Sequence, residues 1–333
     1  MGHMLMLMSM ITQRRLAELA GVTQSAVSLA LRGHPRIHAE TRRRIESLAE
    51  EHGYHRDALV SALSLRRWSR PTGPLVYLES TISRAVPGGD NYWKSVQQRC
   101  RALGLSVQSV PPARRGDAQL TAELVSAGVR GLIVGQDTSA GPPWMIEWPQ
   151  FAVVHCGMFA APEAGDVVAA DLFTAAISAW RALQERGYER VAAVMPVLER
   201  SLSEQMLASA LLTVTRIVGD PRRLSAWIGS PGAARTMTTW LRRQRAQAVL
   251  GYGDGMREVL LRAGIDLPYA ALACGEHRPT AAGVVIPFGK IGARAVDLLM
   301  EKMQNGAVGR ASGRIIHLVE MPWRDGDTLP DLT

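Results

Sequence analysis

The amino-acid sequence predicts a small all-α module at the N-terminus, followed by a larger α/β core with parallel sheets. Between residues 12 and 52, apolar residues recur every three or four positions in three short runs, and a glycine separates the first two runs. From residue 74 onward, strand-like and helix-like runs alternate. The two parts also differ in charge, because residues 1–70 hold eleven arginines and six acidic residues, a net +5 of the +8 carried by the whole chain.

The N-terminal module is expected to contain three helices. Thr12 can cap the first helix, QRRLAELA, which Gly21 ends. Thr23 can cap the second helix, QSAVSLAL, which a following glycine and proline stop. A third helix is expected over residues 39–52, and the glycine-containing turn between the first two makes the module a helix-turn-helix. The residues expected to face its core are Leu16, Leu19, Ala20, Val27, Ala30, Leu31, Ile45, Leu48 and Ala49.

A short helix followed by a basic linker that contains proline and glycine is expected between the two parts. The 260 residues from 74 to 333 then alternate strand-like and helix-like runs, which predicts parallel sheets in one large doubly wound sheet or in two lobes. The expected strands are 75–80, 105–110, 129–135, 151–157, 165–171, 190–195, 223–229, 248–253 and 270–275.

The order of these parts resembles the LacI/GalR family of transcriptional regulators. The most specific match is the string TQRRLAELAGVTQSAVSLALRG, followed by IHAETRRRIESLAEEHGY. Three later segments are similar to the family in the same order: VVAADLFTAAISAWRALQERGYERVAAVM, VVIPFGKIGARAVDLLMEKMQNG and the tail RIIHLVEMPWRDGDTL. Four ordered matches make coincidence a poor explanation.

This resemblance implies a helix-turn-helix headpiece over residues 1–56, a hinge helix and linker over 57–73, and a core over 74–333. The core is expected to have two lobes, like a periplasmic sugar-binding protein. Because the chain crosses between the lobes in that fold, each lobe takes two segments: about 74–165 with 285–317, and about 166–284 with 318–333.

Sequence-specific contacts are expected from the second helix of the module, because that helix enters the major groove in helix-turn-helix proteins. The presentable residues are Gln24, Ser25, Ser28 and Leu29. A glutamine can bond bidentately to adenine, a serine can donate or accept, and a leucine can contact a thymine methyl group. The resemblance places specificity at Gln24, Ser25 and Leu29, although the family often has arginine at the position of Leu29.

Contacts to the DNA backbone are expected from Thr12, Thr23 and Thr41, which lie at helix starts, and from Arg32, unless it is simply a solvated arginine. The resemblance also implies a hinge helix whose leucine wedges into the minor groove. Leu63 matches that position, although this chain lacks the proline and asparagine of the family's hinge pattern.

A small effector, such as a sugar or sugar derivative, is implied between the lobes, where carboxylates and amides would bond hydroxyl groups and an aromatic ring would cover the apolar sugar face. Gln205 stands where the family has an arginine, so a bidentate clamp is missing. Asp171 can instead be a helix cap. The residues that match family effector positions are Trp93, Asp171, Gln205, Asp254 and Glu276, with Tyr92 as the alternative to Trp93 for the aromatic of the cleft wall.

The sequence therefore predicts a cytoplasmic regulator, more plausibly a repressor, that binds a pseudo-palindromic duplex operator as a homodimer. No metal, cofactor or membrane partner is expected. The three cysteines are far apart, no apolar run is long enough to span a bilayer, and the N-terminus lacks the charged region of a signal peptide.

Three alternatives stay open. They are a solute-binding protein without DNA binding, an α/β enzyme with a helical appendage, and a regulator that has lost its effector response. The enzyme finds little support, because the sequence contains no G-x-S-x-G or H-E-x-x-H motif and GYGDG does not match the dinucleotide pattern G-x-G-x-x-G.

Overall fold

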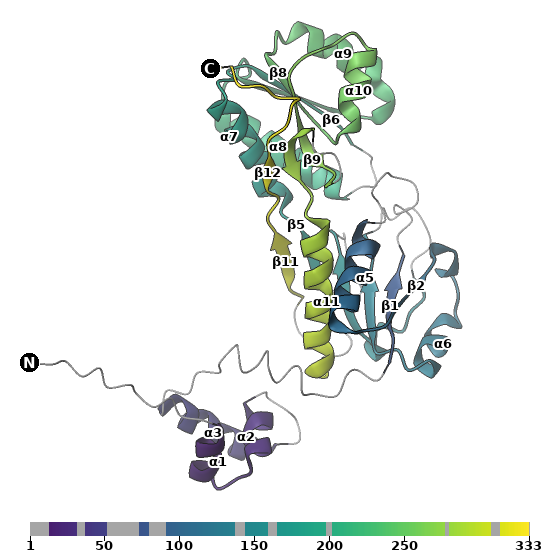
Figure 1. Ribbon diagram of the computed structural model, residues 1–333, viewed down its shortest axis with the longest axis vertical. Helices are drawn as coiled ribbons and strands as arrows, with labels where there is room; N and C mark the ends of the chain where they lie inside the picture. Colours follow the sequence, from purple (N-terminus) through teal and green to yellow (C-terminus); the bar gives the residue numbers. More distant parts are fainter. Residues whose placement is uncertain are drawn as a thin grey trace, which may run out of the picture. The chain divides into compact units, whose positions relative to one another are not determined.

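The computed structural model describes residues 13–31, 37–51, 73–79, 91–136, 144–158, 165–197, 202–276, 280–307 and 314–332. The chain divides into two compact units, residues 1–70 and residues 71–333. The described part of the first unit is helical, and the second unit contains the sheets (Figure 1).

The described part of the N-terminal unit contains three short helices, α1 (Gln13–Ala20), α2 (Gln24–Ala30) and α3 (Ala39–Glu51). Each helix buries one apolar stripe, and Leu16, Val27 and Ile45, one from each helix, are fully buried. Gly21 turns the chain between α1 and α2 with a φ of +63°, a conformation that strains a residue with a side chain. The predicted helix-turn-helix is therefore confirmed.

One residue expected in this core is not buried. Leu19 is 41% exposed, whereas Leu16, Ala17 and Ala20 on the same helix are buried. At about 100° per residue, Leu19 lies roughly 100° around the helix from the centre of that buried stripe. Spacing alone assigned Leu19 to the core, and the position of α3 and α2 against α1 decided otherwise.

The second unit contains two six-stranded sheets, and so the two-lobed alternative is confirmed. Sheet A has the order β11-β5-β4-β3-β1-β2, with all neighbours parallel, and sheet B has the order β12-β10-β9-β8-β6-β7, in which only β12 is antiparallel. The strands of sheet A are β1 (Leu75–Leu78), β2 (Val107–Val110), β3 (Gly131–Val134), β4 (Ala152–Cys156), β5 (Asp166–Ala170) and β11 (Ile316–Val319). Those of sheet B are β6 (Val191–Pro196), β7 (Leu224–Gly229), β8 (Ala248–Gly251), β9 (Tyr269–Cys274), β10 (Ala282–Val285) and β12 (Trp323–Arg324).

The expected boundary between the lobes is wrong at one strand. We expected the second lobe to begin near residue 166, but β5 pairs with β4 and β11 in sheet A. The chain crosses to the second lobe after Ala170, returns after β10, and crosses again between β11 and β12. Strands of both lobes are short apolar runs, so their composition does not tell which sheet receives β5.

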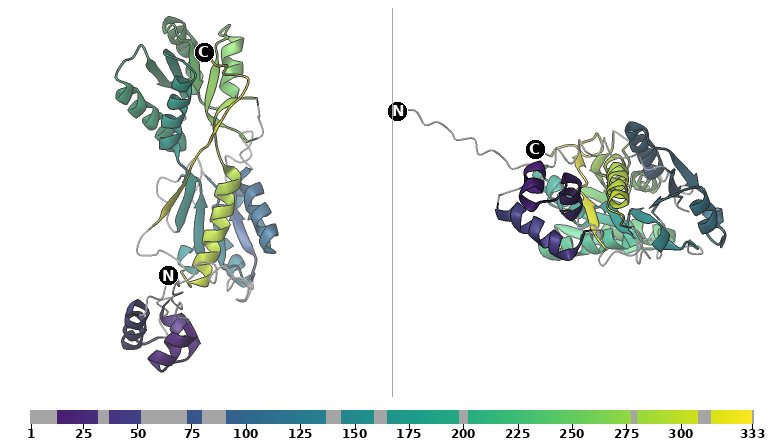
Figure 2. Two further views of the ribbon diagram at one scale, coloured as in Figure 1. Left: turned by 60° about the vertical axis from the view of Figure 1, so that its left-hand side comes forward. Right: turned by 90° about the horizontal axis from the view of Figure 1, so that it is seen from below.

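Both sheets are covered by helices on both faces. On sheet A, α5 (Asn91–Leu103) and α11 (Phe288–Gln304) lie side by side on one face, as two views show (Figures 1 and 2), while α6 (Leu120–Ser126) packs on the other. On sheet B, α7 (Leu172–Glu185) and α8 (Leu202–Val218) cover one face, and α9 (Ala234–Arg243) and α10 (Gly255–Arg262) cover the other. Successive strand residues point to opposite faces, so each buried strand contributes side chains to the apolar layers on both faces of its sheet.

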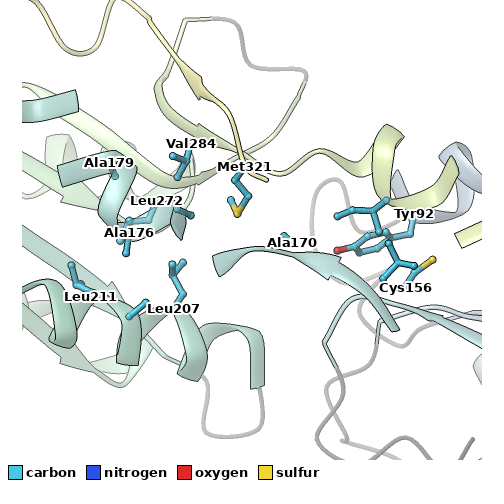
Figure 3. Close-up of a cluster of buried hydrophobic side chains, with 14 of the residues drawn as sticks. Tyr92, Cys156, Ala170, Ala176, Ala179, Leu207, Leu211, Leu272, Val284 and Met321 are labelled. Carbon is cyan, nitrogen blue, oxygen red and sulfur yellow. The ribbon is translucent and has the colours of Figure 1, made fainter. Parts of the chain in front are cut away.

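One apolar cluster runs through both lobes. Its lobe-1 part includes Tyr92 and Cys156, and its lobe-2 part includes Leu207 and Leu272. Figure 3 shows Ala170 and Met321, on two of the crossing segments, between these groups. The two lobes therefore share a continuous core where the chain passes between them.

A buried ion pair ties α11 to sheet A. The ammonium of Lys302 lies 2.8 Å from the Asp166 carboxylate, and the two side chains are only 9% and 8% exposed. The other oxygen of Asp166 accepts a hydrogen bond from the backbone N–H of Ile315, at 3.0 Å, just before β11. This carboxylate therefore joins a helix, β5 and the segment that leads into β11.

All three cysteines are buried free thiols. Burial raises the pKa of Cys100 to about 11 and that of Cys156 to about 12. These thiols are therefore neutral near pH 7, and they pack as small apolar groups.

Within the described residues, no helix has the length and the apolar composition needed to cross a membrane. In the same part of the chain, no group of three or more histidine, cysteine or carboxylate residues is arranged to hold a metal ion.

Candidate DNA-binding surface and effector site

Helix α2 is set up locally by Thr23. The Thr23 hydroxyl accepts a hydrogen bond from the N–H of Ala26, at 3.2 Å, and its extended backbone marks it as the N-cap. Val27 and Ala30 face the core of the unit and are fully buried. Consequently the opposite face of α2 is available, and Gln24 at its start is exposed.

The other predicted DNA contacts divide into two groups. Leu29 is half-buried on α2, and Thr41 is half-buried in the first turn of α3. For Ser25 and Ser28 only the helical backbone is described, and Thr12, Arg32 and Leu63 lie outside the described residues. The minor-groove wedge at Leu63 and the contacts of Thr12 and Arg32 to the DNA backbone therefore stay predictions.

Two of the arginines on α3 serve the module itself. Arg44 donates to the carbonyl of Ala20, at 2.8 Å, and so binds the end of α1. Arg42 donates to the carbonyl of Ile37, at 3.4 Å, just before α3. Arg43 between them is exposed. A run of arginines in the sequence looks like a uniform basic face, but in the structure at least two of its members hold helices in place.

In lobe 2, the structure brings Asp254 close to Gly275, the residue that precedes Glu276, and both carboxylates are predicted effector residues. The Asp254 carboxylate accepts a hydrogen bond from the N–H of Gly275, at 2.9 Å, and so links the turn after β8 to the end of β9. Glu276 is exposed, and its carboxylate accepts from the N–H of Gly289, at 3.4 Å, in the first turn of α11. Both lie beyond the carboxyl ends of parallel strands, where ligands bind in open α/β sheets.

The other three predicted residues have separate surroundings. Asp171 caps α7, because its carboxylate accepts from both the N–H and the hydroxyl of Thr174, at 3.0 and 2.6 Å. Trp93 lies on α5 in lobe 1, half-buried, with its ring centroid 5.2 Å from that of Tyr77. Gln205 is exposed near the start of α8. The capping alternative for Asp171 is thus what the geometry shows.

Two tyrosines lie near the same strand ends: Tyr92, which the sequence offered as the alternative to Trp93, and Tyr252, which the sequence argument did not single out. Tyr92 is buried edge-on against Phe288, with ring centroids 4.8 Å apart. Burial raises the pKa of Tyr92 above its ordinary range, and burial does the same for Tyr252, whose pKa the hydrogen-bonded carboxylate of Glu204 raises further. Tyr252 follows β8, and Tyr92 lies at the start of α5. Segments that follow parallel strands line ligand sites in this architecture, so these positions in the sequence could have indicated both residues.

A family model and several solved structures are similar to this chain. Residues 14–57 match the family model described as bacterial regulatory proteins, lacI family. No curated protein sequence matches the chain. The lac repressor dimer bound to operator and the anti-inducer ONPF has a similar structure, with a TM-score of 0.57 and 15% identity over 96% of this chain and 100% of that one.

Two sugar complexes have the same fold. The transcriptional regulator CelR–cellobiose complex gives a TM-score of 0.56 at 17% identity over 96% of this chain and 99% of that chain. A LacI-family transcriptional regulator from Weissella paramesenteroides with bound glucose gives 0.55 at 15% identity, over 78% and 98%. The family model identifies the N-terminal domain, and the solved structures identify the fold of the rest. Residues 14–57 are therefore a DNA-binding domain of the lacI family, and the rest of the chain has the fold of these regulators.

Proposed function

We propose that the protein is a repressor that binds a pseudo-palindromic operator as a homodimer, reads each half-site with α2, and responds to a small sugar-like effector between its lobes. The observation that carries this proposal is the exposure of Gln24 at the start of a capped helix whose opposite face is buried. The net charge of +5 on residues 1–70 supports binding to phosphates. A dimer follows from the need to read two half-sites.

We expect Gln24→Ala to weaken binding to the preferred sequence by about 1–3 kcal/mol and to relax base preference at one position of each half-site, because a bidentate contact to adenine would be lost. The preferred sequence is first enriched from a pool of randomised duplex DNA, and binding is then measured against salt concentration. Ser47→Ala, at an exposed serine on α3, is the matched control.

Two results would contradict the proposal. One is that no sequence is enriched from the pool at low salt. The other is that Gln24→Ala loses affinity equally for the enriched sequence and for unrelated DNA, which would make Gln24 a backbone contact.

The effector part of the proposal rests on the carboxylates of Asp254 and Glu276 beyond the strand ends and on the aromatic residue Trp93. The family fold and the cellobiose and glucose in related structures favour a sugar. A sugar present at about 100 times its dissociation constant is expected to stabilise the protein by about 2.7 kcal/mol. Thermal unfolding in the presence of single sugars and sugar acids measures this, and Glu276→Gln should reduce the effect of a true ligand. A screen without any stabilising compound would favour a regulator that has lost its effector response.

A further inference from the structure

The two lobes meet first where the chain crosses between them. The N–H of Asp171 donates to the carbonyl of Val319, at 2.8 Å, and the N–H of Val285 donates to the carbonyl of Pro322, at 2.9 Å. These bonds join crossing segments to one another, and the buried Met321 lies among them (Figure 3). This region therefore joins the lobes through the backbone.

A second junction is made by side chains far from these crossings in the sequence. Gln136 follows β3 in lobe 1, and Ser203 lies in the first turn of α8 in lobe 2. The amide nitrogen of Gln136 donates to the hydroxyl oxygen of Ser203, at 2.7 Å, in a partly buried setting. This direct hydrogen bond connects residues 67 positions apart and spans the two lobes.

The backbone makes room for Gln136. Gly157, at the end of β4, has a φ of +90°, and a side chain there would begin 2.7 Å from Cβ and Oε1 of Gln136. Glycine therefore lets the Gln136 side chain lie directly on the backbone of lobe 1. A side chain held by packing loses less conformational entropy when it forms a hydrogen bond.

The first turn of α8 carries a second contact next to Ser203. The Glu204 carboxylate is hydrogen-bonded to Tyr252, which follows β8 in the same lobe. Another hydrogen bond joins the lobes directly. The Glu276 carboxylate in lobe 2 accepts from the N–H of Gly289 on α11, which packs on sheet A of lobe 1. Gln136–Ser203 and Glu276–Gly289 therefore join the two lobes directly, whereas Glu204–Tyr252 lies within lobe 2.

We propose that Gln136 and Ser203 form a latch that holds the two lobes together and sets the balance between joined and separated lobes. A neutral hydrogen bond of this kind shifts such an equilibrium by between about 2-fold and about 10-fold. The proposed effector shifts this balance only by the difference in its affinity for the joined and the separated forms.

Spin labels on each lobe test the latch in the full-length protein. Ala122→Cys on α6 and Thr239→Cys on α9 place labels at exposed positions of the two lobes, and the native cysteines are buried. Pulsed electron spin resonance then gives the distance distribution, and singly labelled samples identify distances between protomers. Gln136→Ala and Ser203→Ala should each raise the ratio of separated to joined lobes by about 2-fold to 10-fold.

Ser209→Ala is the matched control, because the Ser209 hydroxyl bonds only to the Gln205 carbonyl within α8 among the bonds described. Ser203→Thr keeps the hydroxyl and should restore the wild-type distribution. The double variant Gln136→Ala/Ser203→Ala should equal the single variants, since both remove one bond. Distributions of Gln136→Ala and Ser209→Ala that coincide would overturn the latch. The measurement uses neither DNA nor effector, so its failure is distinct from failure of the proposed function.

Discussion

Replacing Lys302 with methionine is expected to lower the free energy of unfolding of the core by about 3–5 kcal/mol, because it leaves the Asp166 carboxylate buried without its cation. The pair is 2.8 Å apart and almost inaccessible to water. Methionine has a similar length and fills the same space, so the loss reports the orphaned charge more than a cavity. Urea unfolding followed by tryptophan fluorescence measures it, since residues 71–333 hold seven of the eight tryptophans.

Two further variants identify the cause of that loss. Lys290→Met removes an exposed lysine from the same helix and should change the free energy of unfolding by less than about 0.5 kcal/mol. In Asp166→Asn/Lys302→Met no charge is left buried, and the Asn oxygen can still accept from Ile315. The double variant should therefore be more stable than Lys302→Met alone. Equal stability of the two would show that packing, and not charge, is responsible.

Replacing Leu16 with alanine is expected to unfold the N-terminal unit and to abolish sequence-specific DNA binding. The side chain is fully buried in a small core shared by three short helices. Removing such a leucine costs about 2–5 kcal/mol, which is a large share of the stability of so small a unit. Binding to the enriched DNA sequence and helical circular dichroism measure the loss.

The matched control is Leu19→Ala on the same helix, where the side chain is 41% exposed. It should keep nearly full DNA binding. Neither variant should affect the α/β core of residues 71–333. The unfolding transition that tryptophan fluorescence detects should therefore occur at the same urea concentration. Loss of DNA binding in Leu19→Ala but not in Leu16→Ala would mean that this face of α1 contacts DNA and that the core assignment is wrong.

The helix-turn-helix was predictable because its determinants are local. The glycine turn after α1, the Thr23 cap and the apolar spacing of α2 lie within a few residues of one another, and the structure shows all three. The alternation of strands and helices was local in the same way. What local pattern did not reveal was the position of Leu19, since that depends on where the other two helices pack.

The candidate effector site was less predictable. Asp254 and Glu276 were found by their positions in a family pattern, and the structure brings Asp254 close to Gly275, the residue that precedes Glu276. Asp171 had two interpretations that sequence alone left open, and its bonds to Thr174 show the cap. Tyr92 was named as the alternative to Trp93, whereas Tyr252 was missed because it lies in the other lobe and no spacing in the sequence relates the two residues.

By itself, the sequence determined that this protein has a helical DNA-binding headpiece and a parallel α/β core, because capping, turn chemistry and periodicity act over a few residues. Only the tertiary structure decided which sheet takes β5, which lysine is buried against Asp166, and that Gln136 meets Ser203 across the lobes. These contacts join residues that are far apart in the chain. Their pairing follows from how the elements pack, which local sequence does not encode.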